Sequence, residues 1–553
     1  MATKVYKHNL VQLIKFVERK KVAVPEFQRG FVWKVRQVKN LFDSLYKKYP
    51  IGSIIIWDTK QKIDARTLNG AKLPSRKYLI LDGQQRMLSL YYLARPKTFS
   101  QRAVQDRFHQ ICDTPHTQLI DFDNFSIGKT AKGEKVLEYY RGDHNEINLK
   151  TLHKLIGESY KFPIIVISLN NYRQAIEVFE RINQAGTKIA TESIFLSETW
   201  TQLTDFAKIL RNWKSKKAEA LTKDVDTVIF IHIFALTYQL DKKAKKNQDP
   251  MGINVKILKK IAGEIREQKS DKYNSVFTEC IKAMGRAMQH LKNQYRIVTV
   301  SELPSQTLLT VLSIFFYYNP KPISERQKRE LNKWFWRSSL SSRYIGSGYN
   351  KNIAPDSTAM KRLALDGTKI AIPKVKISRS LFNDIDLNRG RSTIRNIVRL
   401  ALWQKQPRFI DDDPVTRKDV ETGQKNPEDD HFYPHDLYIK GILDSEVNNV
   451  LNLHLLNGDE NVRKGKKIPS FWLEEQVERI NPSPTDNAIQ KYFDSELLPF
   501  KSLKQLKSFE KPFFQKKERK YVERVNQRYR SFLKKRFLLF KNLLERLQDG
   551  KAR

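Results

Sequence analysis

One segment near the C-terminus contains the strongest chemical pattern in this sequence. The string EDDHFYPHDLY (428–438) carries a D-H-x-x-P order at Asp430 and His431, and it is followed by Asn452 and Asn461. Phosphodiester cleavage requires a neutral histidine that takes a proton from water and oxygen donors that hold Mg²⁺. A further asparagine can fix the orientation of the histidine. These residue types, in this order, predict a metal-dependent nuclease site.

Two alternatives remain open within this segment. Asp429 lies next to Asp430 and could take its place as the metal ligand. His435 and His454 could bind a metal in a different scheme. We interpret both histidines as structural or surface residues, since that is the commoner role of a histidine outside a ligand cluster.

A second group of candidate residues lies near the N-terminus, in the strings VPEFQRGFVW and LILDGQQRMLSL. In the second string an apolar strand runs into Gly83 and then into a helix, so backbone N–H groups and the helix dipole converge on one point, which suits a phosphate. Arg86 and Arg29 could add bidentate phosphate contacts, and Asp82 could hold a divalent cation or position a water. The chain has no GxxxxGKS or GxxxxGKT string, so this is not a Walker P-loop.

The composition indicates a polyanionic partner. Lys plus Arg number 101 against 60 Asp plus Glu, a formal net charge of +41, which favours nucleic acid. Residues 501–553 carry 18 Lys plus Arg against 5 acidic residues, with Phe and Tyr interleaved. We predict a DNA-binding surface there, the alternative being a solvated pair of basic helices. The candidate contacts are Lys516, Lys517, Arg519 and Lys520.

The composition also excludes several classes of protein. Only Cys112 and Cys280 are present, so neither a disulfide framework nor a cysteine zinc finger is possible, and a reducing compartment is expected. No apolar run reaches the roughly 18 residues of a membrane span, and charges interrupt the N-terminal segment where a signal peptide would need an apolar core. We therefore expect a cytoplasmic protein.

Hydrophobic patterning predicts an α/β domain over residues 1–200. Strand-like runs rich in β-branched residues occur at 50–58, 77–83 and 162–169, bounded by Pro and Gly. Amphipathic helical patterns lie between them. This alternation places the candidate residues of the second group at a junction between a strand and a helix.

The rest of the chain is divided by changes in pattern and composition. Apolar residues at three- and four-residue spacing predict a helical connector domain over 201–389. Within it, 334–350 is interpreted as a flexible, basic, aromatic loop that contacts DNA or packs between domains. A nuclease domain at 390–500 and a basic helical tail at 501–553 complete the predicted organisation, that of an α+β multidomain protein.

Four strings in the N-terminal part together resemble a known family. PEFQRGFVW, LFDSLYKKYPIGSIIIW, LILDGQQRMLSL and VFERINQAGTKI occur in this order between Lys7 and Thr199, and they resemble the N-terminal domain of GmrSD-type restriction proteins. The resemblance implies a fold similar to ParB and sulfiredoxin and a site that binds and hydrolyses an NTP, ATP or GTP. The residues implied for this site are Gln28, Arg29, Asp82, Gly83, Gln84, Gln85, Arg86 and Asn183. Asn183 could instead build a tight turn after the preceding helix.

Three C-terminal strings resemble a second domain of the same proteins. DHFYP, NLHLL and NVRKGKKIP are similar to their HNH-type, or ββα-metal, nuclease domain, over about residues 391–473. The resemblance implies that His431 is the general base and that Asp430 and Asn461 bind Mg²⁺ or Mn²⁺. It implies that Asn452 orients the histidine or tethers the loop.

Together, the two resemblances imply a single-chain restriction enzyme. We expect a nucleotide-regulated, Mg²⁺-dependent DNA endonuclease with NTPase activity that acts on modified phage DNA in bacterial defence and could form a homo-oligomer. Two alternatives stay open. One is a noncatalytic, nucleotide-dependent DNA-binding protein, and the other is a nuclease whose N-terminal domain senses DNA modification without hydrolysing NTP. The D-H-x-x-P series favours a nuclease, because a pure DNA-binding protein does not need it.

Overall fold

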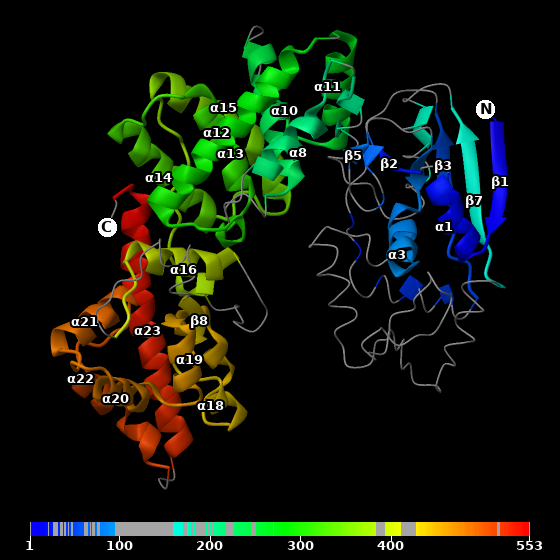
Figure 1. Cartoon of the computed structure of the whole chain (residues 1–553). Coiled ribbons are helices and arrows are strands. Elements are labelled where there is room, and N and C mark those ends of the chain that lie inside the picture. Colours follow the sequence, from blue (N-terminus) through cyan, green and yellow to red (C-terminus); the bar gives the residue numbers. More distant parts are fainter. Residues whose placement is uncertain are drawn as a thin grey trace. The chain divides into compact units, whose positions relative to one another are not determined.

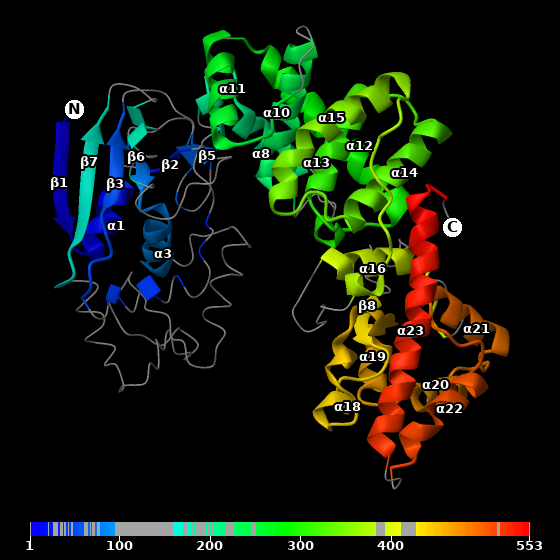
Figure 2. The same cartoon turned by 180° about the vertical axis from the view of Figure 1, so that it is seen from behind.

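The computed structural model contains two compact units, Met1–Ala207 with Ala262–Ser270 and Lys208–Ile261 with Asp271–Arg553 (Figure 1; Figure 2). The structure describes residues 2–19, 22–25, 48–59, 78–94, 159–169, 203–216, 225–244, 250–268, 270–382, 393–410, 427–516 and 520–551, with short pieces inside 31–45, 65–73 and 174–201. The protein is mixed α and β and mostly helical, as expected for an α+β multidomain chain. The finer division into four domains stays a prediction.

A four-stranded mixed sheet organises the N-terminal unit. Its strand order is β1 (Ala2–His8), β7 (Phe162–Ser168), β3 (Ile54–Asp58) and β6 (Tyr78–Asp82). β3 runs parallel to β7, and the other neighbouring pairs are antiparallel. A smaller sheet contains β2 (Val24–Pro25), β4 (Ala65–Arg66) and β5 (Lys72–Leu73). The three strand-like runs of the sequence correspond to β3, β6 and β7.

Successive residues of β3 face two different cores. Ile54 and Ile56 pack with residues of α1 (Leu10–Arg19) and α3 (Gln84–Ala94), whereas Ile55 belongs to a separate cluster on the other side of the sheet. Figure 1 shows α1 and α3 beside the strands. Burial on both faces explains why this strand is a continuous apolar run in the sequence.

Apolar helices form the next part of the chain, as the three- and four-residue spacing predicted. α13 (Thr307–Tyr318) is buried along most of its length and packs against α10, α12 and α15. The helices between residues 206 and 382 are α8 (Phe206–Lys216), α10 (Thr227–Ala244), α11 (Val255–Gln268), α12 (Lys272–Tyr295), η3 (Val300–Glu302), α13, α14 (Glu325–Leu340), α15 (Ser347–Asp366) and η4 (Arg379–Phe382).

The segment 334–350 is not a loop over most of its length. It contains the end of α14 and the start of α15, and a buried polar network holds the turn between them. Trp334 donates through its indole N–H to the Tyr344 hydroxyl at 3.0 Å, and Tyr344 donates to Asp356 at 2.5 Å. Arg343 pairs with the same carboxylate at 2.6 Å. The prediction of a flexible loop is therefore wrong, because its aromatic and basic residues serve packing inside the helical part.

The C-terminal part is centred on a two-stranded antiparallel sheet and a helix. β8 (Pro427–His431) pairs with β9 (Leu453–Asn457), with Asp430 opposite His454, and α19 (Gly458–Lys464) directly follows β9. The remaining helices are α16 (Thr393–Gln404), α18 (Asp436–Ile439), η6 (Ser445–Asn448), η7 (Val450–Asn452), α20 (Pro469–Arg479), α21 (Asp486–Ser495), α22 (Leu503–Glu510), η8 (Lys511–Phe514) and α23 (Tyr521–Gln548). Strand, strand, helix is the order that a ββα-metal domain requires, and that assignment stays a prediction.

The long helix α23 is part of this C-terminal core. Its Phe532 stacks on Phe432 with ring centroids 5.5 Å apart and contacts Tyr433 at 5.0 Å. Arg536 of the same helix is fully buried and donates to the backbone carbonyls of Leu451, Glu496 and Leu497. Figure 2 shows α23 in red beside α16. The predicted boundary between a nuclease domain and a basic tail therefore falls inside one hydrophobic core.

Candidate active site

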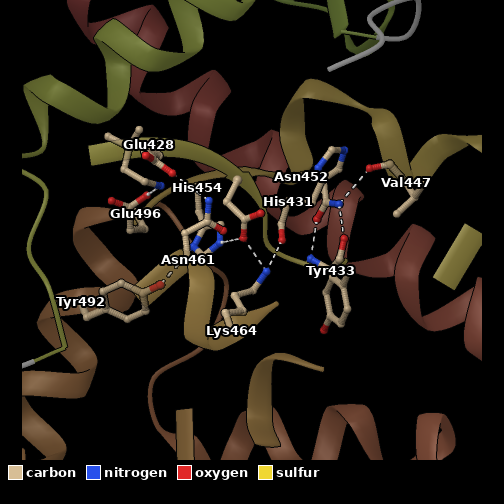
Figure 3. A network of polar contacts seen from close by, with 12 residues as sticks. Glu428, His431, Tyr433, Val447, Asn452, His454, Asn461, Lys464, Tyr492 and Glu496 are labelled. Atoms are coloured by element: carbon tan, nitrogen blue, oxygen red, sulfur yellow. Dashed lines mark hydrogen bonds and ion pairs between the residues drawn. The ribbon is translucent and has the colours of Figure 1, made fainter. Parts of the chain in front are cut away.

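Asp430 of β8 belongs to a polar network with His454 of β9 and Lys464 of α19, and Figure 3 labels the two partners. Its Oδ2 accepts hydrogen bonds from Nε2 of His454 at 3.0 Å and from Nζ of Lys464 at 2.5 Å. Burial alone would raise the pKa of Asp430, but the His454 hydrogen bond and the Lys464 charge outweigh it and hold this pKa well below its usual value. Asp430 is therefore ionised at neutral pH.

Asp429 serves a different function. Successive side chains of a strand point to opposite faces, so Asp429 is turned away from the Asp430 network. Its two carboxylate oxygens form ion pairs with Arg395 at 2.9 Å and Arg399 at 2.7 Å, both on α16. These contacts join β8 to α16 and favour Asp430 over Asp429 as the candidate ligand.

His431 ends β8 and is held by a residue that the sequence did not single out. Its Nε2 lies 3.1 Å from Oδ1 of Asn448. Because an amide oxygen only accepts hydrogen bonds, this contact places the proton on Nε2 and leaves the lone pair on Nδ1. Burial lowers the pKa of His431 below its usual value, and the charge of Asp430 opposes this shift only in part. A neutral imidazole with a free basic nitrogen is the form that a general base requires.

Asn452 is fully buried and bonds to backbone atoms on both sides of the loop between β8 and β9. Its Oδ1 accepts from the amide of Tyr433 at 3.0 Å, and its Nδ2 donates to the carbonyls of Tyr433 and Val447 at 2.8 Å each. This is the geometry of a loop tether, the second of the two predicted roles. The contact that orients the imidazole comes from Asn448 instead.

Asn461 lies on α19 and is held by Glu428, a second residue missed in the sequence. Its Nδ2 donates to Oε2 of Glu428 at 3.0 Å, so its carbonyl oxygen is the atom that could bind a cation. Glu428 shares a face of β8 with Asp430, two residues away. A Cβ on Gly458 would lie 3.2 Å from Oε1 of Glu428, so the Glu428 carboxylate packs closely against the start of α19.

The chemistry of these donors fits a hard divalent cation only in part. Carboxylate and amide oxygens of Asp430 and Asn461 are ligands that Mg²⁺ and Mn²⁺ prefer. Within the described ranges, however, no group of three or more His, Cys, Asp or Glu side chains has a geometry that could hold a metal. The ammonium of Lys464 already forms an ion pair with Asp430, at the position where a metal ion would bind this carboxylate. Such a site would need ligands from water or from a substrate phosphate.

His454 and His435 have the structural contacts expected of them. His454 is fully buried, and its Nδ1 lies 3.2 Å from the Tyr492 hydroxyl. Burial lowers the pKa of His454 to about 4, so it is neutral when it donates to Asp430. The ring of His435 lies 5.8 Å from that of His431, centroid to centroid.

The N-terminal candidate site is built on two glycine turns. Gly83, with φ +80°, joins β6 to α3, and Asp82 pairs with Arg86 at 3.0 Å across this turn. Arg86 also donates to the carbonyl of Ile51, and a Cβ on Gly52 would lie 2.2 Å from its Nη1. The guanidinium therefore fills the space that Gly52 leaves open and ties the loop before β3 to the DGQQR turn.

The remaining predicted residues of this site are described only in part. The Trp33 amide donates to Oε1 of Gln85 at 3.3 Å, which joins the first motif to the DGQQR segment. Gln84 is buried. Gln28, Arg29 and Asn183 lie outside the described residues. Of the predicted DNA contacts, Lys516 and Lys520 are exposed, and Lys517 and Arg519 lie outside the described residues.

Comparison with known proteins supports the N-terminal assignment. Residues 10–200 match the family described as GmrSD restriction endonuclease, N-terminal domain. The chain is also 23% identical over 543 residues to an uncharacterized protein of Methanocaldococcus jannaschii, MJ0686, covering 85% of this chain and 87% of that protein. The match confirms the predicted likeness of this region to GmrSD-type restriction proteins, and it does not extend to the C-terminal part of the chain. None of the described helices is long and apolar enough to cross a membrane.

Proposed function

We propose that this protein is a nucleotide-regulated, Mg²⁺-dependent DNA endonuclease of HNH type that acts on modified phage DNA. The observation that carries the proposal is the β8–β9–α19 unit, in which β8 carries Asp430 and His431 and α19 carries Asn461, bonded to Glu428 of β8. The GmrSD match of residues 10–200 supports the restriction role. The strongly basic composition supports DNA as the substrate.

The residues of the C-terminal site would divide the work of cleavage between them. Nδ1 of His431 takes the proton from the attacking water, and Asn448 keeps the ring in the required orientation. Asp430 and Asn461 would hold Mg²⁺, which when bound neutralises charge on the phosphate and the leaving oxygen. Asn452 fixes the loop that follows the histidine, so that the imidazole and its neighbours keep their spacing.

The N-terminal domain would regulate cleavage and make no direct contribution to the cut. The DGQQR turn offers Asp82, the helix N-terminus at Gln84 and the guanidinium of Arg86 to a nucleotide. Nucleotide hydrolysis breaks no DNA bond, so its proposed effect is to shift a conformational equilibrium of the nuclease. The helical middle is the proposed coupling element.

One assay tests the main proposal. Purified protein is incubated with unmodified plasmid and with phage DNA carrying glucosylated hydroxymethylcytosine, with and without ATP or GTP. We expect cleavage of modified DNA that requires Mg²⁺ or Mn²⁺, depends on nucleotide and stops with EDTA. Undiminished cutting in excess chelator, or no cutting of any DNA, would overturn the proposal.

One observation favours the noncatalytic alternative. Lys464 already neutralises Asp430, and a DNA-binding protein that has lost its metal would have such an arrangement. Tight DNA binding without cleavage in this assay would support that function.

A further inference from the structure

The buried ammonium of Lys464 is the most unusual charge in the C-terminal site. Its side chain is 1% exposed, and Nζ lies 2.5 Å from both Oδ2 of Asp430 and the backbone carbonyl of His431. A lysine charge is placed in a protein interior only where a partner compensates for lost hydration. Lys464 is therefore fixed between the candidate metal ligand and the candidate base.

This ammonium changes the charge that a metal ion would meet. Asp430 carries the negative charge at the centre of the network, and Lys464 already matches that charge. Glu428 adds a carboxylate at the exposed edge, where it is bonded to Asn461. A divalent cation bound at Asp430 would be repelled by the nearby Lys464 ammonium. It would also find the negative charge of Asp430 already neutralised, so its binding should be weak.

Resting on the proposed nuclease function, we propose that Lys464 is an internal counter-cation that makes metal binding depend on the DNA phosphate. Without DNA, the ammonium neutralises Asp430 and the site binds a divalent cation weakly. The phosphate of bound DNA supplies the missing negative charge, so metal and DNA bind together. Mg²⁺ commonly binds through one or two carboxylates plus substrate phosphates, which suits this arrangement.

Lys464 acts through Asp430 and does not itself reach the substrate, because its side chain is enclosed by the protein. It is a positioning residue, and its effect should appear in metal affinity as well as in the rate of cleavage.

The test measures Mn²⁺ binding to the full chain by electron paramagnetic resonance, without any reading of activity. The background is His431→Ala, which leaves DNA uncut, and an unmodified duplex is added at a concentration at which anisotropy shows it bound. The same measurement on the Asp430→Asn variant, which lacks the carboxylate of this site, gives the Mn²⁺ bound by DNA and by other sites. This amount is subtracted from the total. We expect weak Mn²⁺ binding without DNA and binding at least about tenfold tighter with it.

A second variant separates charge from structure. Lys464→Met keeps the length of the side chain and removes its charge, so Mn²⁺ affinity without DNA should rise by about tenfold or more. Circular dichroism establishes that the variant is folded. If it is not folded, the measurement with and without DNA on the parent protein decides the question.

Equal Mn²⁺ affinity with and without DNA would overturn the proposal, as would unchanged or weaker affinity in folded Lys464→Met. Either result leaves the nuclease function intact if wild-type protein still cuts DNA with Mg²⁺. Failure of the nuclease function itself would show differently, as an absence of cleavage and of any Mn²⁺ signal that depends on Asp430.

Discussion

Two Asp–cation pairs lie at the two candidate sites, and they are built in opposite ways. Asp82 and Arg86 are four residues apart on one strand–helix junction, and their side chains are 25% and 18% exposed. Asp430 and Lys464 are 34 residues apart on different elements, and their side chains are 18% and 1% exposed, so it is the cation that is enclosed. The same charges thus form a local, accessible pair in one site and a nonlocal, buried pair in the other.

The difference has a functional consequence. An accessible pair can exchange its partner for a ligand phosphate at little cost, because water already competes for both charges. A buried pair cannot separate without leaving a charge unpaired in the interior. The N-terminal turn is therefore suited to binding and releasing a nucleotide, and the C-terminal network to holding a fixed geometry.

The largest expected effect is on DNA cleavage by the C-terminal site. His431→Ala should lower the rate of cleavage by about 10²–10⁴-fold, because it removes the general base. NTP turnover should be unchanged, since the nucleotide site is built from other residues. Plasmid nicking and phosphate release are measured on the same preparation. His435→Ala is the matched control and should cleave at close to the wild-type rate. Near-wild-type nicking by the folded His431→Ala protein would refute the assignment of the base.

Removing each cation in turn measures how much each pair contributes to the stability of its part of the chain. Lys464→Met should lower the stability of the C-terminal part by about 3–5 kcal/mol, because the largely buried Asp430 carboxylate loses the charge of Lys464 and keeps the hydrogen bond from neutral His454. Arg86→Met should cost only about 1.5 kcal/mol, because water replaces the lost partner of Asp82. Hydrogen exchange followed segment by segment measures both. The double variant Lys464→Met/Asp430→Asn should recover most of the stability lost in Lys464→Met. Equal losses of stability in Lys464→Met and Arg86→Met would show that the two pairs do not differ in this way.

The accessible pair should matter for nucleotide chemistry. Asp82→Ala or Arg86→Ala should weaken NTP binding or hydrolysis, while the secondary structure of the nuclease part stays intact. His431→Ala, which leaves this turn untouched, is the reciprocal control. Isothermal titration and phosphate release provide the measurement. Wild-type hydrolysis of both ATP and GTP by the two variants would place the nucleotide site elsewhere.

The smallest effect concerns the exposed cations of the C-terminal segment. Charge reversal at Lys516 and Lys520 should weaken binding to all DNA sequences about equally and lower the slope of log K against log salt by about 0.9 per lost phosphate contact. Truncation of 501–553 is not a suitable test, because α23 supplies Phe532 and Arg536 to the core. Lys282→Glu on α12 is the control. An unchanged salt slope in an anisotropy titration would show that the two lysines are only solvated.

Short-range sequence patterns predict the local structure of the N-terminal site. Three strands of the N-terminal sheet, the DGQQR turn at a strand end and the helical middle all follow from short-range patterns, because alternation, helical spacing and glycine turns act over a few residues. The Asp82–Arg86 pair is local in the same way. The D-H-x-x-P order singled out Asp430 and His431, and the structure has both residues at the end of β8.

The partners of these residues come from distant segments of the chain and depend on how those segments pack. Asn448 reaches His431 from 17 residues away, and Lys464 reaches Asp430 from 34, so neither contact has a short-range signal. Glu428 could have been found from strand alternation, since it shares a face with Asp430. Arg536 resembles the other basic residues of its segment in the sequence, yet it is buried because three backbone carbonyls converge on it. Charge and spacing determine what chemistry a residue can do, but its partner depends on which distant segments pack together.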